Sequence, residues 1–133
     1  MKKEQLLQKL KNQGFSEEII NAFSKVKRED FIPEEFRKYA YEDMAISIGK
    51  GQTISQPYTI AFMLSLLELD VLKNSDDIKI MEVGSGSGYV LALLNQILPK
   101  ANIYGVERVN ELIKSSKKIL ENISKVKIVK NGK

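Results

Sequence analysis

A glycine-rich turn is the part of the chain best suited to hold a ligand. Its sequence, EVGSGSGY, runs from Glu82 to Tyr89, between an apolar segment typical of a strand and one typical of a helix. Glycines permit positive φ and let a ligand come close to the backbone. A helix start adds free amide donors at the positive end of its dipole. The pattern therefore indicates a cofactor cradle at the carboxyl end of a strand.

An acidic residue, Glu107, ends the next predicted strand. A carboxylate there is suited to accept from two ribose hydroxyls, as acids do about 20 residues after the glycines of dinucleotide-binding folds. The glycines at 84, 86 and 88 give the spacing G-x-G-x-G, whereas a nicotinamide-dependent oxidoreductase would show G-x-G-x-x-G. With Glu82 two residues before the first glycine, the pattern resembles the first motif of the S-adenosylmethionine methyltransferases. The alternative is a glycine-rich connection followed by an ordinary surface glutamate.

A polar loop upstream carries a second group of candidate side chains. It runs from Ile48 to Pro57 with the sequence IGKGQTISQP, and its two glycines let it fold tightly. The hydroxyls of Thr53 and Ser55 and the amides of two glutamines are suited to hold a carboxylate and its neighbouring peptide groups. Composition alone leaves open a simpler role, in which the loop only caps a helix that starts at Pro57.

The same loop closely resembles the signature that precedes the methyltransferase core in protein-L-isoaspartate O-methyltransferases. The resemblance covers nearly the whole chain; besides the loop and the glycine turn it includes Arg28, Phe31-Ile32-Pro33, Ala40-Tyr41-Glu42-Asp43, Glu107-Arg108 and, weakly, Asn131-Gly132. It implies an enzyme that transfers a methyl group from S-adenosyl-L-methionine to the carboxylate of isoaspartyl residues in damaged proteins, as a step of protein repair. After the methyl transfer, the cofactor would be released as S-adenosyl-L-homocysteine.

The resemblance also implies roles for individual residues. Thr53 and Ser55 are the expected catalytic residues, which position the substrate carboxylate, and Glu107 binds the ribose. The expected cofactor-binding residues are Glu82, Gly84, Ser85, Gly86, Ser87, Gly88, Tyr89, Glu107, Arg108 and Asn131. A model carboxylate has a pKa near ~4, so the attacking carboxylate is already ionised at neutral pH. No histidine base is needed, which fits a chain that has none.

The chain departs from the family pattern at a few positions. Ala45 and Ser47 stand where the family usually has prolines, and Val90 stands where it often has glutamine. Asn131 stands where an acid usually contacts the adenine amino group. Its side-chain carbonyl can still accept a hydrogen bond, but without charge. Weaker cofactor binding is therefore expected.

Hydrophobic periodicity predicts the elements that position these residues. The N-terminal part should hold helices over 4–13 and 16–26, the second capped by Ser16, then an irregular segment over 28–56 and a buried helix over 57–69. The remainder alternates strand and helix, over residues 78–83, 89–98, 102–106, 110–122 and 126–129. This alternation argues for a parallel sheet with crossover helices. The expected fold class is α/β, a Rossmann-like methyltransferase fold with an N-terminal helical extension.

One structural domain is expected, with residues 1–56 forming the helical extension and substrate loop and residues 57–133 the first half of the core. The family's sheet has seven strands, as the resemblance implies, and only three can be read here, in the order 3-2-1. The fold is therefore expected to be truncated after the third parallel strand, as in a fragment or a split gene. The open edge along the first strand predicts self-association and poor activity of the chain alone.

Composition limits the remaining classes of function. The absence of cysteine and histidine excludes disulfides, Ser-His-Asp triads and most zinc sites, and no metal is predicted. No apolar run approaches the ~20 residues that span a bilayer, so neither a membrane partner nor a location outside the cytoplasm is expected. The net charge of +4 comes largely from lysines, many of them between 114 and 133. These lysines are expected to be solvated, since no aromatic interleaving supports a nucleic-acid patch.

Two rival functions remain open. One is a methyltransferase that acts on nucleic acid or on a small molecule, for which the glycine turn and the basic charge would suffice. The other is a cofactor-binding module without activity, which the missing half of the sheet supports. The loop signature argues against a methyltransferase of nucleic acid or small molecules, but it does not argue against a cofactor-binding module without activity.

Overall fold

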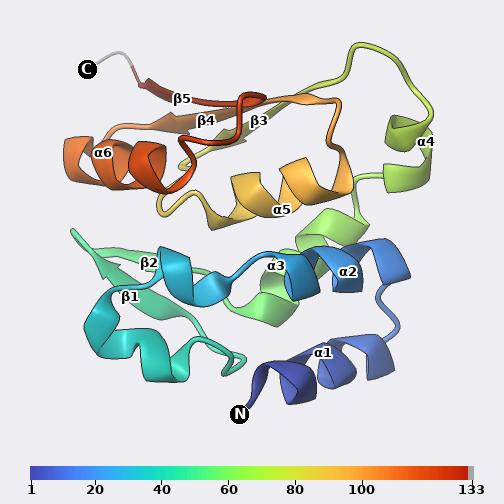
Figure 1. Ribbon diagram of the computed structural model, residues 1–133, viewed down its shortest axis with the longest axis horizontal. Coiled ribbons are helices and arrows are strands. Elements are labelled where there is room, and N and C mark those ends of the chain that lie inside the picture. Colours follow the sequence, from blue (N-terminus) through green and yellow to red (C-terminus); the bar gives the residue numbers. More distant parts are fainter. Residues whose placement is uncertain (132–133) are drawn as a thin grey trace.

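The computed structural model describes residues 1–131 and contains two parts, a mainly helical N-terminal part and a three-stranded α/β part (Figure 1). The N-terminal part comprises α1 (Lys3–Asn12), α2 (Glu17–Lys25), η1 (Arg28–Phe31), η2 (Glu34–Tyr39), β1 (Ile46–Gly49), β2 (Gln52–Ile54), α3 (Pro57–Ser65) and α4 (Leu69–Lys73). The α/β part comprises β3 (Lys79–Val83), α5 (Tyr89–Ile97), β4 (Asn102–Glu107), α6 (Asn110–Ile119) and β5 (Val126–Lys130). Gly132, at the end of the sequence resemblance, lies outside the described residues.

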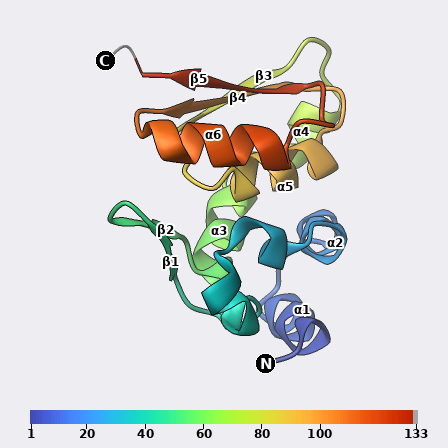
Figure 2. The same cartoon turned by 60° about the vertical axis from the view of Figure 1, so that its left-hand side comes forward.

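The three strands of the α/β part form a parallel sheet in the order β3-β4-β5, which confirms the predicted order. Both crossover helices, α5 and α6, lie on the same face of this sheet (Figures 1 and 2). The side chains of Ile103 and Ile128 on that face are buried. The predicted Rossmann-like α/β arrangement is therefore present over these residues.

The opposite face of the sheet is uncovered over the described residues. Met81 pairs in register with Tyr104, and Val83 with Val106 and then Val129, so these side chains share one face. Met81 is 63% exposed and Val83 71%. Apolar side chains that project from the centre of a sheet are seldom left in water, and a patch of them marks an interaction surface.

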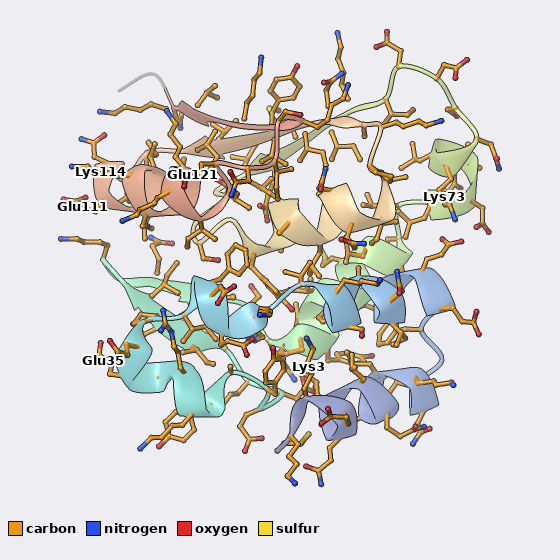
Figure 3. The ribbon with its side chains drawn as sticks, in the orientation of Figure 1. Lys3, Glu35, Lys73, Glu111, Lys114 and Glu121 are labelled. Atoms are coloured by element: carbon orange, nitrogen blue, oxygen red, sulfur yellow. The ribbon has the colours of Figure 1, made fainter. Side chains whose placement is uncertain are left out.

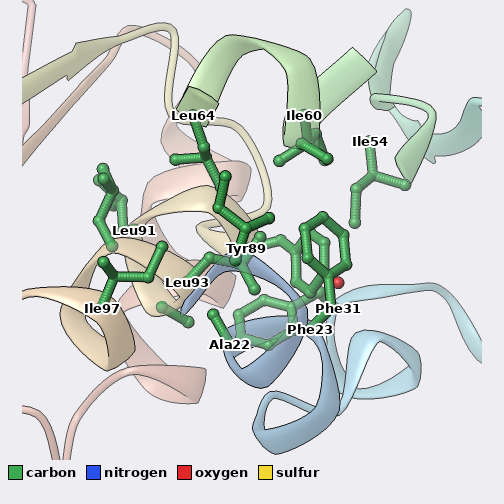
Figure 4. Close-up of a cluster of buried hydrophobic side chains, with 14 of the residues drawn as sticks. Ala22, Phe23, Phe31, Ile54, Ile60, Leu64, Tyr89, Leu91, Leu93 and Ile97 are labelled. Carbon is green, nitrogen blue, oxygen red and sulfur yellow. The ribbon is translucent and has the colours of Figure 1, made fainter. Parts of the chain in front are cut away.

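A single hydrophobic core joins the two parts. Phe23 on α2 and Phe31 on η1 pack against Tyr89 at the start of α5, with ring centroids 6.2 and 5.4 Å apart respectively. Figure 4 shows these rings with Ile60 and Leu64 of α3 beside them. The helix α2 begins at the predicted cap, because Ser16 Oγ accepts from the amide of Ile19. The boundary expected at residue 56 stays a prediction.

The expectation of an irregular segment over 28–56 is wrong. Two short 3-10 helices are followed by an antiparallel hairpin of β1 and β2, in which Ser47 pairs with Thr53 and Gly49 with Gln52. The two residues between the strands, Lys50 and Gly51, have φ of 56° and 71°. Positive φ at both positions of a two-residue turn matches the twist of the flanking strands. Glycine punctuation within such short strands concealed the hairpin in the sequence.

The prediction of one buried helix over 57–69 is also wrong in part. The helix α3 ends at Ser65, and the chain passes through a left-handed residue, Glu68 with φ 49°, before α4 begins. Only one stripe of α3 is buried, whereas Met63 is 61% exposed and Leu66 62%. An apolar sequence predicts that a helix packs against other elements, but it does not predict how many sides of the helix are covered. Here the described residues cover one side.

Apart from the buried Arg28 and Glu107, the charged residues among those described are partly or fully exposed. Figure 3 shows Glu111 and Lys114 on α6 and Glu121 in the turn just after this helix. The lysines between 114 and 130 are all exposed. Lys73 of α4 forms an ion pair with Glu18 of α2, with a distance of 3.1 Å between Nζ and Oε1. Within residues 1–131, none of the helices has the length and apolar character needed to cross a membrane.

Candidate cofactor and substrate site

The glycine turn joins the carboxyl end of β3 to the start of α5. Gly84, Gly86 and Gly88 have φ of 79°, 52° and 88°, a region that other residues enter only at a cost. The turn is fixed to the neighbouring strand, because the amides of Gly84 and Ser85 both donate to the carbonyl of Val106, at 2.7 and 3.2 Å. No atom outside the immediate backbone lies within 4 Å of where a side chain on Gly84 would begin. The backbone there is open to a ligand.

Glu107, at the end of β4, lies beside this turn, as its place in the sequence predicted. Its Oε1 accepts from the amide of Gly86 and its Oε2 from the amides of Arg108 and Val109, each at 2.9 Å. Burial alone would raise the pKa of Glu107, but the backbone hydrogen bonds from Val109, Gly86 and Arg108 hold it below its usual value. The site therefore holds an ionised carboxylate next to the glycine backbone.

Two polar atoms in the same region have no hydrogen-bond partner among the described residues. They are Oε1 of Glu82 and Oγ of Ser85, both buried. Burial, and secondarily the charge of Glu107, raises the pKa of Glu82 to about 8. Buried polar atoms are rarely left unpaired, so this pair of atoms is suited to a ligand that supplies a donor and a positive charge.

Two members of the predicted cofactor-binding set serve packing in this structure. A side chain on Gly88 would lie 2.8 Å from Leu120 Cδ1, so glycine at this position lets α5 approach α6. The ring of Tyr89 is 1% exposed and lies in the hydrophobic core. Its amide donates to Ser87 Oγ at 3.2 Å, which holds the end of the turn. The remaining predicted residues, Arg108 and Asn131, are exposed beside Glu107, whose carbonyl accepts from the amide of Asn131 at 2.9 Å.

The hairpin of β1 and β2 carries the predicted substrate residues and lies against the glycine turn. The point where a side chain on Gly86 would begin is 3.5 Å from Ile48 Cδ1, so this β1 side chain lies next to the turn. Lys50 at the hairpin tip lies 3.8 Å from the carboxylate of Glu111 on α6. Thr53 and Ser55 are both exposed. Ser55 follows β2 directly, at the base of the hairpin.

Arg28 is a buried residue to which the sequence assigned no role. It is fully shielded from water, and its Nη2 donates to the carbonyls of Met44 and Ser55 at 3.3 and 3.0 Å. The guanidinium lies over the ring of Tyr89, 5.1 Å from its centroid. Burial lowers the pKa of Arg28, although the neighbouring groups Tyr89 and Asp43 favour its charged form. No local pattern in the sequence distinguishes this arginine from a surface one.

Among residues 1–131, no cluster of three or more acidic, histidine or cysteine side chains is arranged to hold a metal ion. The side chains that gather at the strand ends are the carboxylates of Glu82 and Glu107, together with the hydroxyl of Ser85, and backbone amides hold only Glu107. Such groups recognise hydroxyls and amines of an organic ligand.

A glycine turn after the first parallel strand and an acid after the second define a Rossmann-like nucleotide-binding half-site of the methyltransferase type. The family model for protein-L-isoaspartate(D-aspartate) O-methyltransferase matches residues 1–132. The chain belongs to this family, as the loop signature predicted.

Individual relatives agree with this assignment. The chain is 43% identical to the protein-L-isoaspartate O-methyltransferase of Methanothrix thermoacetophila over 122 residues, which are 91% of this chain and 55% of the relative. It is 45% identical to the enzyme of Petrotoga mobilis over 121 residues, which are 90% of this chain and 54% of the relative. The chain thus spans about half the length of the curated relatives that it matches.

Solved structures share the fold. A protein-L-isoaspartate O-methyltransferase structure superposes with a TM-score of 0.79 at 25% identity, covering 98% of this chain and 42% of the other. A Plasmodium falciparum protein assigned to the same enzymes, in complex with S-adenosyl-L-homocysteine, superposes with a TM-score of 0.76 at 28% identity and covers 94% of this chain and 61% of the other. The Rossmann-like methyltransferase fold is therefore confirmed.

Proposed function

We propose that this chain contributes to a protein-L-isoaspartate O-methyltransferase the cofactor cradle and one wall of the substrate site. The reaction would methylate the carboxylate of isoaspartyl residues in damaged proteins. One observation carries this proposal: the hairpin that bears Thr53 and Ser55 lies next to the glycine turn, with Ile48 beside Gly86. The two predicted half-sites, separated by about 30 residues of sequence, are thus neighbours in space.

The residues present fit S-adenosylmethionine as the cofactor. Glu107 is ionised and suited to ribose hydroxyls, although its oxygens already accept from three backbone amides. A carboxylate has about four acceptor positions, so a ribose would share the carboxylate with these amides or displace one of them. The unpartnered Glu82 Oε1 and Ser85 Oγ are suited to the ammonium group and the positive charge of the same molecule. When bound, this cofactor would supply an activated methyl group on its sulfonium.

The chain's own residues would act by positioning. Ser55 and Thr53 offer hydroxyl donors from the hairpin, and we assign to them the orientation of the substrate carboxylate. No general base is required, because a carboxylate is ionised at neutral pH. Holding the two reactants in line and excluding water are the contributions left to the protein.

Isoaspartyl proteins and peptides are the proposed substrates, and nucleic acid is not. The exposed lysines of α6 and β5 lack the interleaved aromatic side chains of a nucleic-acid patch. A cytoplasmic location remains part of this proposal. A second candidate function, cofactor binding without turnover, is favoured by one fact: the chain spans 55% of the Methanothrix relative.

The decisive experiment is radiolabelled methyl transfer from S-adenosylmethionine to an isoaspartyl peptide, with the aspartyl peptide and an RNA as controls. Any transfer is expected to reach the isoaspartyl peptide and neither control, at the low rate expected of this chain by itself. Transfer to RNA would support the rival methyltransferase class. Calorimetric binding of the cofactor without transfer to any acceptor would support the binding module.

A further inference from the structure

Arg28 is the most deeply buried charge among the described residues. Its exposure is 0%, and the other buried polar side chains, Ser85, Glu107 and Ser116, are smaller. No carboxylate lies within ion-pairing distance of it among the described residues, and its Nε and Nη1 have no hydrogen-bond partner there. Asp43 favours the charged form from a distance, but burying a charge without a direct ion pair is costly, so the position calls for an explanation beyond packing.

The contacts of Arg28 close the base of the substrate hairpin. Met44 precedes β1 and Ser55 follows β2, and one nitrogen of Arg28 donates to the carbonyls of both. The strand pairs between them, Ile46 with Ile54 and Ser47 with Thr53, continue the closure toward the tip. Short two-stranded hairpins are marginally stable by themselves. The guanidinium thus fixes where the two ends of the hairpin leave the body of the protein.

The same guanidinium also contacts the cofactor side of the site. It lies 5.1 Å from the centroid of the Tyr89 ring, and Tyr89 is the first residue of α5, directly after the glycine turn. An arginine can donate in the plane of its fork while its face rests on an aromatic ring. One buried side chain therefore connects Ser55 to the end of the turn that carries Gly84 and Gly86.

We propose that Arg28 is a positioning residue for methyl transfer, which fixes the position of the Ser55 hairpin relative to the glycine turn. The proposal rests on the function proposed above for these two loops. Arg28 itself cannot touch the substrate, because it is fully buried; it acts through the backbone of Ser55 and the ring of Tyr89. Loss of this link would leave the cofactor cradle intact and let the hairpin move relative to it.

The test compares Arg28→Lys with Arg37→Lys in the full chain. Lysine keeps the charge but lacks the planar fork. Arg37 is a matched control, because its Nε also donates to two backbone carbonyls, those of Glu29 and Ile32. These hydrogen bonds involve neither the ends of the hairpin nor Tyr89. Arg28→Gln is a second variant, whose uncharged amide can still donate without the cost of a buried charge.

Two measurements are made on each variant. The first is hydrogen exchange of the amides over residues 46–54, compared with those of β4; the second is the kcat for an isoaspartyl peptide, compared with the Kd for the cofactor. For Arg28→Lys we expect at least tenfold faster exchange confined to the hairpin. We also expect a kcat at least tenfold lower with a cofactor Kd within twofold of the unmodified protein. Arg37→Lys should change each quantity by less than twofold.

Results that contradict the role of Arg28 can be distinguished from results that contradict the proposed function. Exchange that rises equally in the hairpin and β4, or failure of both Arg28 variants to fold, would make Arg28 a residue of general stability and overturn the proposal. Wild-type hairpin exchange in Arg28→Lys would overturn it as well. If the unmodified protein methylates no isoaspartyl peptide, the proposed function fails, while the exchange comparison still decides whether Arg28 holds the hairpin.

Discussion

The carboxylate of Glu107 accepts a hydrogen bond from the backbone amide of Gly86 across 2.9 Å. This contact joins the end of β4 to the turn after β3, so the acid and the glycines form one unit. The other carboxylate oxygen accepts from Arg108 and Val109, the two amides that lead out of β4. The acid thus organises the turn and, under the proposed function, also binds the ribose.

Replacement of Glu107 by alanine should weaken cofactor binding. Hydrogen bonds to a charged acceptor contribute roughly 1.5–3 kcal/mol, so a loss of about 10- to 100-fold in affinity is expected. Calorimetry with S-adenosylmethionine checks this prediction, and circular dichroism confirms that the variant is folded. Exposed Glu111 on α6 provides a control substitution to alanine. Unchanged affinity in a folded Glu107→Ala protein would remove Glu107 from the site.

Replacement of Ser55 by alanine should reduce methyl transfer more than cofactor binding. The carbonyl of Ser55 already accepts from Arg28, so the substitution leaves the backbone anchor and deletes only the exposed hydroxyl. We expect a fall of at least tenfold in kcat/KM for an isoaspartyl peptide, about the effect of one lost hydrogen bond of ~1.4 kcal/mol, with a cofactor Kd within twofold. Ser47→Ala, on the opposite strand of the same hairpin, is the control. Equal losses of rate and affinity would assign Ser55 to the cofactor pocket or to folding.

The sequence was sufficient to predict the part of the site that depends on local rules. The turn from β3 to α5 could be found because glycines, an apolar strand and an apolar helix follow each other within 20 residues. Glu107 could be placed because parallel strands end at the same edge of a sheet. Both inferences use only the order of residues along the chain.

Features that depend on long-range packing could not be predicted. The carbonyls that Arg28 contacts are 16 and 27 residues away in sequence, and nothing near Arg28 signals its burial. The sequence also could not show which side of α3 is buried, because the helix is apolar all round and only tertiary contacts decide which side faces water. Tyr89 was assigned to the cofactor for its place after the turn, although its ring fills the core.

Glu82 should make the stability of the protein fall as pH rises from about 4.5 to 8. Its pKa is raised from 4.5 to about 8 in the folded protein, so between these values the native state binds more protons than the unfolded state. The slope of the unfolding free energy with pH is then negative for this group. Each unit of pKa shift corresponds to about 1.4 kcal/mol, so a loss of at least ~1 kcal/mol between pH 5 and 8 is expected.

The comparison of Glu82→Gln with the unmodified protein isolates this contribution from that of other groups. Urea unfolding at pH 5 and pH 8 should show that glutamine, which cannot ionise, gives a relative gain in stability at pH 8. Glu121→Gln, at an exposed position just after α6, is the control and should show no such gain. Parallel pH profiles for Glu82→Gln and the unmodified protein would mean that Glu82 is not protonated in the folded state near neutral pH.

The uncovered face of the sheet should make the 133-residue chain self-associate. Met81 and Val83 project from β3, which pairs only with β4 among the described strands, so an apolar patch adjoins a row of free backbone groups. Such an edge readily pairs with another chain, and a lysine on it discourages pairing. We therefore expect the sedimentation coefficient to rise with concentration, and Met81→Lys to reduce that rise. Met44→Lys makes the same chemical change at a 47% exposed position outside the three-stranded sheet, just before β1, and should leave association unchanged. A chain that sediments as a monomer at all concentrations, or an equal effect of both substitutions, would show that this face and edge do not drive association.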